Sequence, residues 1–182
     1  MDVKALWDDR FKQGLPSLEI PDPFFIRMYE QYISKTYPSG GKALDLAAGV
    51  GRHSLYLSDR QWHTTAIDIS AVAIGKLNVS NPAIHTHALD IADYQFEKES
   101  FDLIVLYYHF ERAIFPEIFK ALKPGGLFIC KLAVSYSGNQ AALQKDELLS
   151  LVTDFELISH TERPVRDRGV VEYLGRKVAS LS

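Results

Sequence analysis

The chain opens with two segments whose apolar residues recur at helical spacing. Residues 2–13 predict a first helix, Pro21 and Pro23 interrupt the pattern, and residues 24–37 predict a second helix. The second helix should end before the turn sequence at 38–41, which holds one proline and two glycines. Residues 1–38 are therefore expected to form an N-terminal helical cap segment.

Beyond residue 39, short apolar runs alternate with stretches of helical periodicity. The runs predict strands at 43–47, 63–69, 83–89, 101–108, 127–134, 155–161 and 169–178. The stretches between them predict helices at 52–59, 70–77, 116–122 and 145–153. Alternating strands and helices are typical of right-handed crossovers in a parallel sheet that helices cover on both faces.

The last two predicted strands have no helix between them, so they should pair antiparallel. We expect one α/β domain over residues 1–182, with a doubly wound, Rossmann-like core at 39–182. Its seven-stranded, mostly parallel sheet should carry an antiparallel C-terminal strand. A length of 182 residues suits a single domain with one sizeable core.

The overall composition is that of an ordinary globular protein. Apolar residues make up 47% and charged residues 24%, and the net charge of −3 argues against nucleic acid as the main partner. No apolar run approaches the roughly 20 residues that cross a bilayer. Because the N-terminus also lacks a secretory pattern, we expect a cytoplasmic protein without a membrane partner. The single cysteine, Cys130, lies in an apolar run and is expected to be a strand residue rather than a nucleophile.

A glycine turn at residues 47–51 is the most informative feature of the sequence. The apolar strand that contains Asp45 runs into Gly49 and Gly51, and a helix follows at once from Arg52. Glycine adopts positive φ and has no Cβ, so the backbone can approach a ligand closely there. A strand, a glycine turn and a helix N-terminus together are typical of a nucleotide-type site.

Two acidic positions follow the next two predicted strands. Asp68 ends the second strand and Asp90, with Ile91, follows the third. Ligands of parallel sheets bind beyond the carboxyl ends of the strands, and a carboxylate there can accept from both hydroxyls of a ribose. Taken alone, each aspartate could equally be a loop acid or a helix N-cap.

In their order and spacing, these segments and the predicted strand at 101–108 resemble class I S-adenosylmethionine-dependent methyltransferases. The likeness extends over nearly all of residues 40–180. The N-terminal Trp7-Asp-Asp-Arg-Phe11 and the segment Tyr108-His-Phe-Glu-Arg112 resemble a small-molecule subgroup, similar to the tellurite-resistance type. The resemblance implies S-adenosylmethionine as cofactor and a small molecule or a metalloid oxyanion as methyl acceptor.

The resemblance also assigns cofactor contacts to individual positions. Asp68, with Ile69 beside it, would hold the ribose, and Asp90 with Ile91 would meet the adenine. The turn at Gly49 and Gly51 would meet the amino acid end of the cofactor, and Asp45 would support either this turn or the amino group of the cofactor. Ala47 stands where the family usually has glycine, which places a methyl group beside the expected cofactor pocket.

Three consecutive residues after the fourth strand are the candidates for chemistry. Tyr107 and Tyr108 could offer an aromatic face to a sulfonium cation, although strand alternation should send one of them into the core. His109 is the best candidate for a general base, since its side chain titrates near neutral pH. A structural histidine that bonds the loop backbone is the alternative.

Other polar and aromatic residues have less specific readings. Trp7 could anchor the N-terminal segment as a lid over the cofactor, or it could simply pack against the second helix. Arg112, Arg163 and Arg166 could face an anionic substrate or lie solvated on the surface. His85 and His87 lack further ligands, so no metal site is predicted.

The sequence thus predicts an enzyme that transfers a methyl group by in-line displacement to a small-molecule acceptor. A non-catalytic protein that binds S-adenosylmethionine is one alternative. An NAD(P)-dependent oxidoreductase is another, but its fingerprint requires a third glycine where this chain has Ser54.

Overall fold

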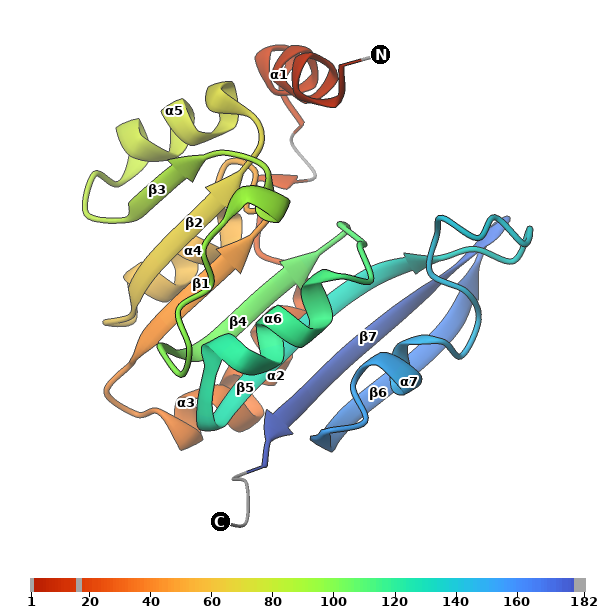
Figure 1. The fold of residues 1–182 in the computed structure, drawn as a ribbon. Helices are drawn as coiled ribbons and strands as arrows, with labels where there is room; N and C mark the ends of the chain where they lie inside the picture. Colours follow the sequence, from red (N-terminus) through yellow and green to blue (C-terminus); the bar gives the residue numbers. More distant parts are fainter. Residues whose placement is uncertain (1, 16–17, 179–182) are drawn as a thin grey trace. The chain divides into compact units, whose positions relative to one another are not determined.

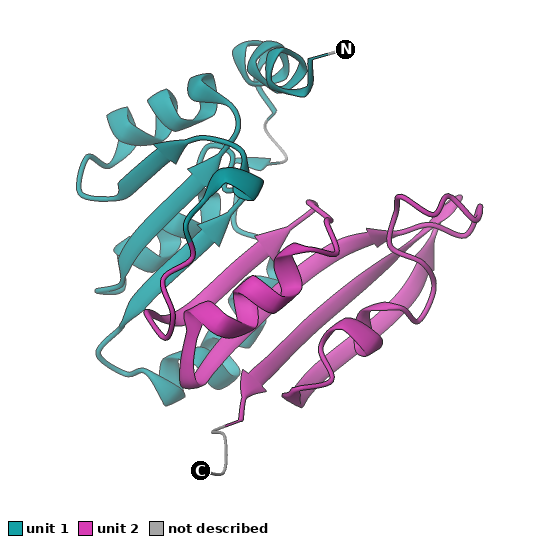
Figure 2. Cartoon of the chain, viewed as in Figure 1, with its two compact units in different colours: residues 1–95 teal, residues 96–182 magenta. Residues whose placement is uncertain are grey.

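The structure is a computed structural model that describes residues 2–15 and 18–178. Contacts between Cα atoms divide the chain into two compact units, residues 1–95 and residues 96–182 (Figure 2). Each unit has its own strands and buried core, and each is described by itself.

Unit 1 begins with helices and continues as a parallel sheet. Its helices and strands are α1 (Val3–Gln13), α2 (Pro23–Met28), a π-helix (Tyr29–Ile33), α3 (Ser34–Thr36), β1 (Lys42–Leu46), α4 (Arg52–Ser58), β2 (His63–Asp68), α5 (Ala71–Ser80), β3 (His85–Ala88) and a 3₁₀ turn (Ile91–Asp93). The strand order is β3-β2-β1, and both pairs are parallel (Figure 1). The predicted alternation of strands and helices is confirmed here.

Local sequence explains where the helices of unit 1 begin. The Asp22 side chain accepts from the backbone N–H of Phe24, and Pro23 occupies the first helical turn, where its missing N–H costs nothing. Ser70 caps α5 by accepting from the N–H of Ala73, as its position before the apolar run predicts. The predicted helix at 24–37 is continuous in space but passes through one π-helical turn.

Unit 2 contains the longer strands. Its elements are β4 (Phe101–Tyr107), α6 (Ile114–Ala121), β5 (Leu122–Val134), α7 (Leu148–Leu151), β6 (Phe155–Val165) and β7 (Arg168–Lys177). The strand order is β4-β5-β7-β6 (Figure 1). β4 and β5 are parallel, whereas β7 runs antiparallel to both β5 and β6. The predicted antiparallel C-terminal pair is confirmed.

Two predicted boundaries in unit 2 are wrong. The strand predicted at 127–134 begins at Leu122 in the structure, and its added residues include Gly125, which has φ +80° and lies where the register with β4 shifts between Phe101 and Leu103. The predicted helix at 145–153 is only the single turn of α7. Asp146 has φ +61°, which is incompatible with a right-handed helix, so the helix cannot begin before it.

Buried apolar side chains of the central strands form the core of each unit. In unit 1, Leu44, Leu46 and Ile67 are fully buried, and in unit 2 Leu103, Leu106 and Phe128 are fully buried. Near-continuous apolar runs such as that of β4 are typical of strands covered on both faces. Among the helices described, none combines the length and the apolar character that a membrane crossing needs.

Candidate functional site

The glycine turn of unit 1 departs sharply from ordinary backbone geometry. Ala47, Gly49 and Gly51 all have positive φ, at 54°, 58° and 79°. A Cβ built on Gly51 would lie 2.5 Å from a methyl carbon of Leu77, so this position also has no room for a side chain. The two predicted glycines are therefore required by conformation. Ala47 adopts the same left-handed region without glycine's freedom, at a cost of about 1 kcal/mol.

Asp68 lies at the end of β2 and is bonded directly to this turn. Its Oδ2 accepts from the N–H of Gly49 at 2.8 Å, and its Oδ1 accepts from the N–H of Ser70 at 2.8 Å. The side chain is buried. The sequence prediction that Asp68 and the glycine turn belong to one site is consistent with this geometry, because the carboxylate and the turn share a hydrogen bond.

Asp45, in the strand before the turn, bonds to the helix after it. Its Oδ2 accepts from the Ser54 hydroxyl of α4 at 2.7 Å, in a fully buried setting. Burial raises the pKa of this carboxyl from 3.8 to about 7, against the opposing effects of the Ser54 hydrogen bond and the Arg52 charge. Ser54, which stands where a dinucleotide fingerprint needs glycine, therefore has a structural task in this chain.

Asp90 and its neighbours are arranged as an N-cap. The Asp90 side chain is exposed and accepts from the N–H of Ala92 at 3.0 Å, at the start of the 3₁₀ turn. Ile91 is buried and Ile69 is half-buried. The N-cap interpretation thus describes the local geometry of Asp90, and its role toward an adenine stays a prediction.

Helix α1 lies over the glycine turn. The Phe11 ring is its buried side chain, and a Cβ built on Gly49 would lie 3.1 Å from that ring. Asp8 Oδ1 accepts from the Ser70 hydroxyl at 2.6 Å and from the N–H of Val72 at 3.2 Å, at the start of α5. The Lys76 ammonium donates to the Phe11 carbonyl at 2.5 Å. The buried aromatic residue of α1 is therefore Phe11, and the half-buried Trp7 ring is tilted by 31° against it, with the ring centroids 5.8 Å apart.

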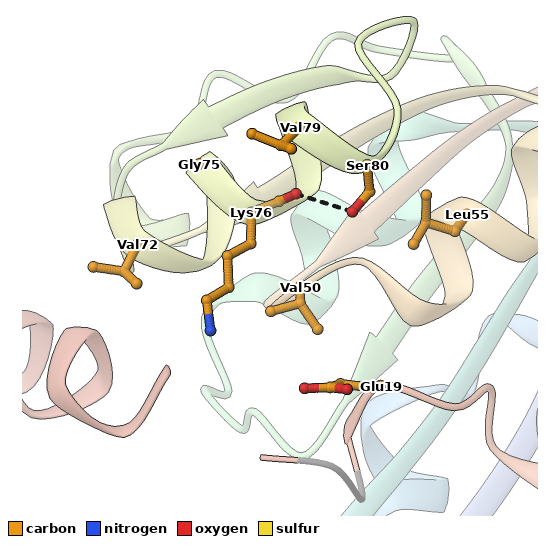
Figure 3. A pocket seen from close by; sticks show the side chains of 8 residues that line it. All are labelled: Glu19, Val50, Leu55, Val72, Gly75, Lys76, Val79 and Ser80. Atoms are coloured by element: carbon orange, nitrogen blue, oxygen red, sulfur yellow. Dashed lines mark hydrogen bonds between the residues drawn. The ribbon is translucent and has the colours of Figure 1, made fainter. Parts of the chain in front are cut away.

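A groove of about 670 Å³ adjoins both the glycine turn and α1. Its lining consists of Glu19, Val50, Leu55, Val72, Gly75, Lys76, Val79 and Ser80 (Figure 3). One face of α5 forms a wall, and Val50 of the glycine turn also lines it (Figure 3). Phe11 is the one buried side chain of α1, and polar contacts of Asp8 and Lys76 add to its hold on the rest of unit 1.

Two residues at the start of α4 form hydrogen bonds with the segment that precedes α2. The Nε2 of His53 accepts from the N–H of Asp22 at 3.3 Å, and the His53 ring lies 4.4 Å from the Phe25 ring. The Arg52 guanidinium donates to the carbonyl of Ile20 at 3.3 Å. Buried His53 therefore holds the segment before α2 against the start of α4.

In unit 2 the three candidate residues after β4 have different surroundings. Tyr107 is buried and Tyr108 is 47% exposed, so strand alternation sends one ring inward as predicted. Tyr108 has φ +57°, a strained conformation for a large side chain, and its N–H donates to the Lys131 carbonyl at 2.8 Å. The Nε2 of His109 is buried and has no hydrogen-bond partner among the residues that the structure describes.

Neither role predicted for Arg112, contact with an anionic substrate or a solvated surface position, describes its surroundings. Its guanidinium is bonded to Glu147 and to backbone carbonyls of the loop after β5. The hydrogen bond from Arg112 lowers the pKa of the Glu147 carboxyl, and the same contact raises the pKa of Arg112. Arg163 lies 3.6 Å from Glu172. Glu147 was missed in the sequence, because nothing in its local pattern marks it as a partner of Arg112.

Cys130 is a buried residue of β5, as predicted. Burial raises the pKa of its thiol, which keeps it protonated and unreactive near neutral pH. Among the described residues, no three His, Cys, Asp or Glu side chains gather in a way that could hold a metal ion.

The sequence and the fold both match known methyltransferases. Residues 43–126, which include the glycine turn, Asp68 and Asp90, match a family model described as a methyltransferase domain. A demethylmenaquinone methyltransferase from Clavibacter sepedonicus is 30% identical over 105 residues, which cover 52% of this chain and 42% of that protein. The match thus spans about two fifths of the length of that relative.

Two solved structures extend the comparison to nearly the whole chain. N-methyltransferase NodS from Bradyrhizobium japonicum WM9, in complex with S-adenosylhomocysteine, has a TM-score of 0.74 and 17% identity, covering 97% of this chain and 99% of NodS. TehB from Haemophilus influenzae has a TM-score of 0.71 and 23% identity, covering 94% of this chain and 67% of TehB. These matches and the family model confirm the predicted fold class and the predicted resemblance to S-adenosylmethionine-dependent methyltransferases.

Proposed function

We propose that this chain binds S-adenosylmethionine through the glycine turn of unit 1 and transfers its methyl group to a small-molecule acceptor. The observation that carries the proposal is the hydrogen bond between the Asp68 carboxylate and the N–H of Gly49. It joins an acidic group suited to a ribose with a turn suited to close backbone approach.

Residues of unit 1 fit the parts of this cofactor. Asp68, beside Ile69, offers a buried carboxylate to the ribose hydroxyls, and the backbone at Gly49 and Gly51 offers a surface without side chains to the amino acid end. Exposed Asp90 and buried Ile91 offer a polar and an apolar group to the adenine. Phe11 lies against Gly49, so binding at the turn requires α1 to shift.

Ala47 and Asp45 hold the turn in shape. Ala47 keeps the left-handed conformation that the family usually gives to glycine. Asp45 links the turn-bearing strand to α4 through Ser54, and this bond fixes the start of the helix relative to the turn.

Residues of unit 2 would serve the acceptor. S-Adenosylmethionine supplies a methyl group already activated on a sulfonium sulfur, so the protein mainly has to orient the acceptor and exclude water. The exposed ring of Tyr108 would offer an aromatic face to the sulfonium, whereas the Tyr107 ring is buried in the core. Half-buried His109 would take the proton of an acceptor that arrives protonated.

The class of acceptor follows from the relatives only in outline. The sequence relative is a demethylmenaquinone methyltransferase, and NodS is an N-methyltransferase. A hydroquinone, a catechol, an aliphatic amine and a metalloid oxyanion such as tellurite therefore make a suitable acceptor panel.

Binding of the cofactor tests the first half of the proposal. Calorimetry and thermal shift with S-adenosylmethionine, S-adenosylhomocysteine, NAD and NADP should give heat and a higher melting temperature with the first two only, because a ligand of the native state stabilises it. A response to NAD or NADP alone would favour an oxidoreductase. No response to any of the four would refute the assignment.

Turnover tests the second half. Formation of S-adenosylhomocysteine with at least one member of the acceptor panel is expected. Cofactor binding without turnover across a broad panel would favour a non-catalytic binding protein.

A further inference from the structure

Two loops of unit 2 follow the carboxyl ends of its parallel strands. Residues 108–113 follow β4 and carry Tyr108 and His109, and residues 135–147 follow β5. Because ligands of parallel sheets bind beyond these ends, the two loops are the part of unit 2 best placed to meet an acceptor.

One guanidinium joins the two loops. Arg112 Nε donates to Glu147 Oε1 at 2.6 Å, and Nη2 donates to Glu147 Oε2 at 2.9 Å. Nη1 donates to the Gln140 carbonyl at 2.9 Å, and Nη2 also donates to the Ala142 carbonyl at 3.0 Å. Four hydrogen bonds from one planar fork are something that a lysine ammonium could not reproduce.

Gln144 of the second loop also bonds to the Glu147 carboxylate and to the loop backbone. The N–H of Gln144 donates to Glu147 Oε2 at 2.7 Å, and its side-chain amide donates to the carbonyls of Asn139 and Ala142 at 2.6 and 2.7 Å. We call Arg112, Gln144 and Glu147 the Arg112 clasp. It sets the path of the loop at 138–147 relative to the segment that carries His109.

A hollow of about 670 Å³ lies on this loop. It is lined by Ser135, Tyr136, Gly138, Gln144, Lys145, Asp146, Glu162 and Pro164. The lining includes hydroxyl, amide and charged groups of both signs, which suit a ligand with several hydrogen-bonding groups. Gln144 belongs to both the clasp and the hollow, so the clasp fixes one wall of the hollow.

From these contacts we infer that Arg112 is a positioning residue of the acceptor site, and that the hollow receives the polar part of the acceptor. The inference rests on the proposed function. The partners of Arg112 lie in the loop after β5, so the inference assigns it to the acceptor and not to the cofactor.

Hydrogen exchange measured by mass spectrometry tests the clasp without any acceptor. Arg112→Ala should raise exchange by about tenfold in residues 138–147 and in residues 108–115, where the N–H groups of Tyr108, Ile114 and Phe115 are hydrogen-bonded, whereas β7 should keep its protection. Arg112→Lys should behave like Arg112→Ala, because the charge stays but the fork is lost. Lys120→Ala, which removes an exposed ion pair with Glu117 in the same unit, is the matched control and should change neither segment.

Chemical rescue separates the fork from a general loss of structure. Millimolar guanidinium should restore protection to both loops in Arg112→Ala, and ammonium at the same concentration should not. Equal rescue by both ions, or unchanged exchange at 108–115 in the variant, would overturn the inference.

Kinetics then connect the clasp to the acceptor. With the panel member that the wild type methylates, Arg112→Lys should raise the acceptor KM by about tenfold or more, keep kcat within about threefold, and leave the Kd of S-adenosylmethionine unchanged. An equal loss in cofactor affinity would refute a role confined to the acceptor. If the wild type methylates no acceptor, the proposed function fails, and the exchange and rescue results decide the clasp by themselves.

Discussion

The glycine turn of unit 1 and the Arg112 clasp of unit 2 hold functional segments in different ways. The turn takes its shape from three positive φ angles within five residues and from a backbone N–H bonded to Asp68. The clasp takes its shape from a side-chain fork that reaches across 35 residues of sequence. A turn fixed by backbone geometry suits a cofactor shared by a family, whereas a loop fixed by one side chain can change with the acceptor.

The largest expected effect comes from breaking the turn at Asp68. Asp68→Ala removes a charged acceptor and leaves the N–H of Gly49 without this partner. Affinity for S-adenosylmethionine should fall by about 100-fold, since hydrogen bonds to charged groups contribute about 1.5–3 kcal/mol each. Calorimetry measures the loss, and circular dichroism checks the fold. Asp93→Ala, an exposed acid in the same unit, is the control, and equal affinities in both variants would remove Asp68 from the site.

The second effect concerns the buried carboxyl beneath the turn. The pKa of Asp45 is about 7 in the folded state and about 4 in the unfolded state. Between pH 4 and pH 7, Asp45 is therefore protonated in the folded state and ionised in the unfolded state. The free energy of unfolding should therefore decrease by a few kcal/mol as pH rises from about 4 to about 7, and this contribution should level off above pH 7.

Asp45→Asn tests this pH dependence. Urea unfolding at pH 5 and pH 8 should give the variant a smaller decrease in stability than the wild type. An identical decrease in both proteins would show that another group carries the pH dependence.

Glu147 should show the opposite pH dependence. Its pKa is lowered in the folded state, so its contribution to stability is present above the ordinary pKa of a glutamate and is lost as pH falls below that value.

A smaller effect is expected from loosening α1. If α1 closes again over a bound cofactor, Phe11 is the side chain that anchors it, so Phe11→Ala should speed dissociation of S-adenosylmethionine by about tenfold, because burial of one large side chain contributes about 1.5–3 kcal/mol. Stopped-flow dissociation measures it. Val3→Ala, at an exposed position of the same helix, should leave the rate unchanged. A rate that is equal in both variants would mean that α1 does not retain the cofactor.

The smallest effect should come from Ala47→Gly. Glycine adopts φ 54° freely, so relief of the left-handed conformation should raise the free energy of unfolding by about 0.5–1 kcal/mol. Urea denaturation measures the change, with Ala71→Gly, an exposed helical position, expected to lower stability instead. A decrease in Ala47→Gly would show that the added flexibility outweighs the relieved strain.

This contrast also explains what the sequence could predict. The strands of both units follow from continuous apolar runs, and the turn follows from glycines whose need for positive φ is local. Asp68 and Asp45 could be predicted as site residues because Asp68 ends such an apolar run and Asp45 lies within one. All of these signals lie within a few residues of the feature that they predict.

The contacts that were missed join distant parts of the chain. Asp8 meets Ser70 across 62 residues, and Arg112 meets Glu147 across 35. A charged residue in an exposed loop has many possible partners, and local spacing does not choose among them. The shortness of α7 was missed for a related reason, since the positive φ of Asp146 accompanies a loop built around Arg112 rather than a local breaker such as proline.

The contact between the Trp7 and Phe11 rings gives the protein a built-in optical signal. The chain has two tryptophans, and the other, Trp62, is 3% exposed and donates to the Tyr29 hydroxyl at 3.2 Å. Trp7 lies on the helix that covers the glycine turn, with the Arg10 guanidinium 4.9 Å from its ring. We therefore expect a movement of α1 to change the emission of Trp7 more than that of Trp62. Unlabelled protein would then report any such movement in real time.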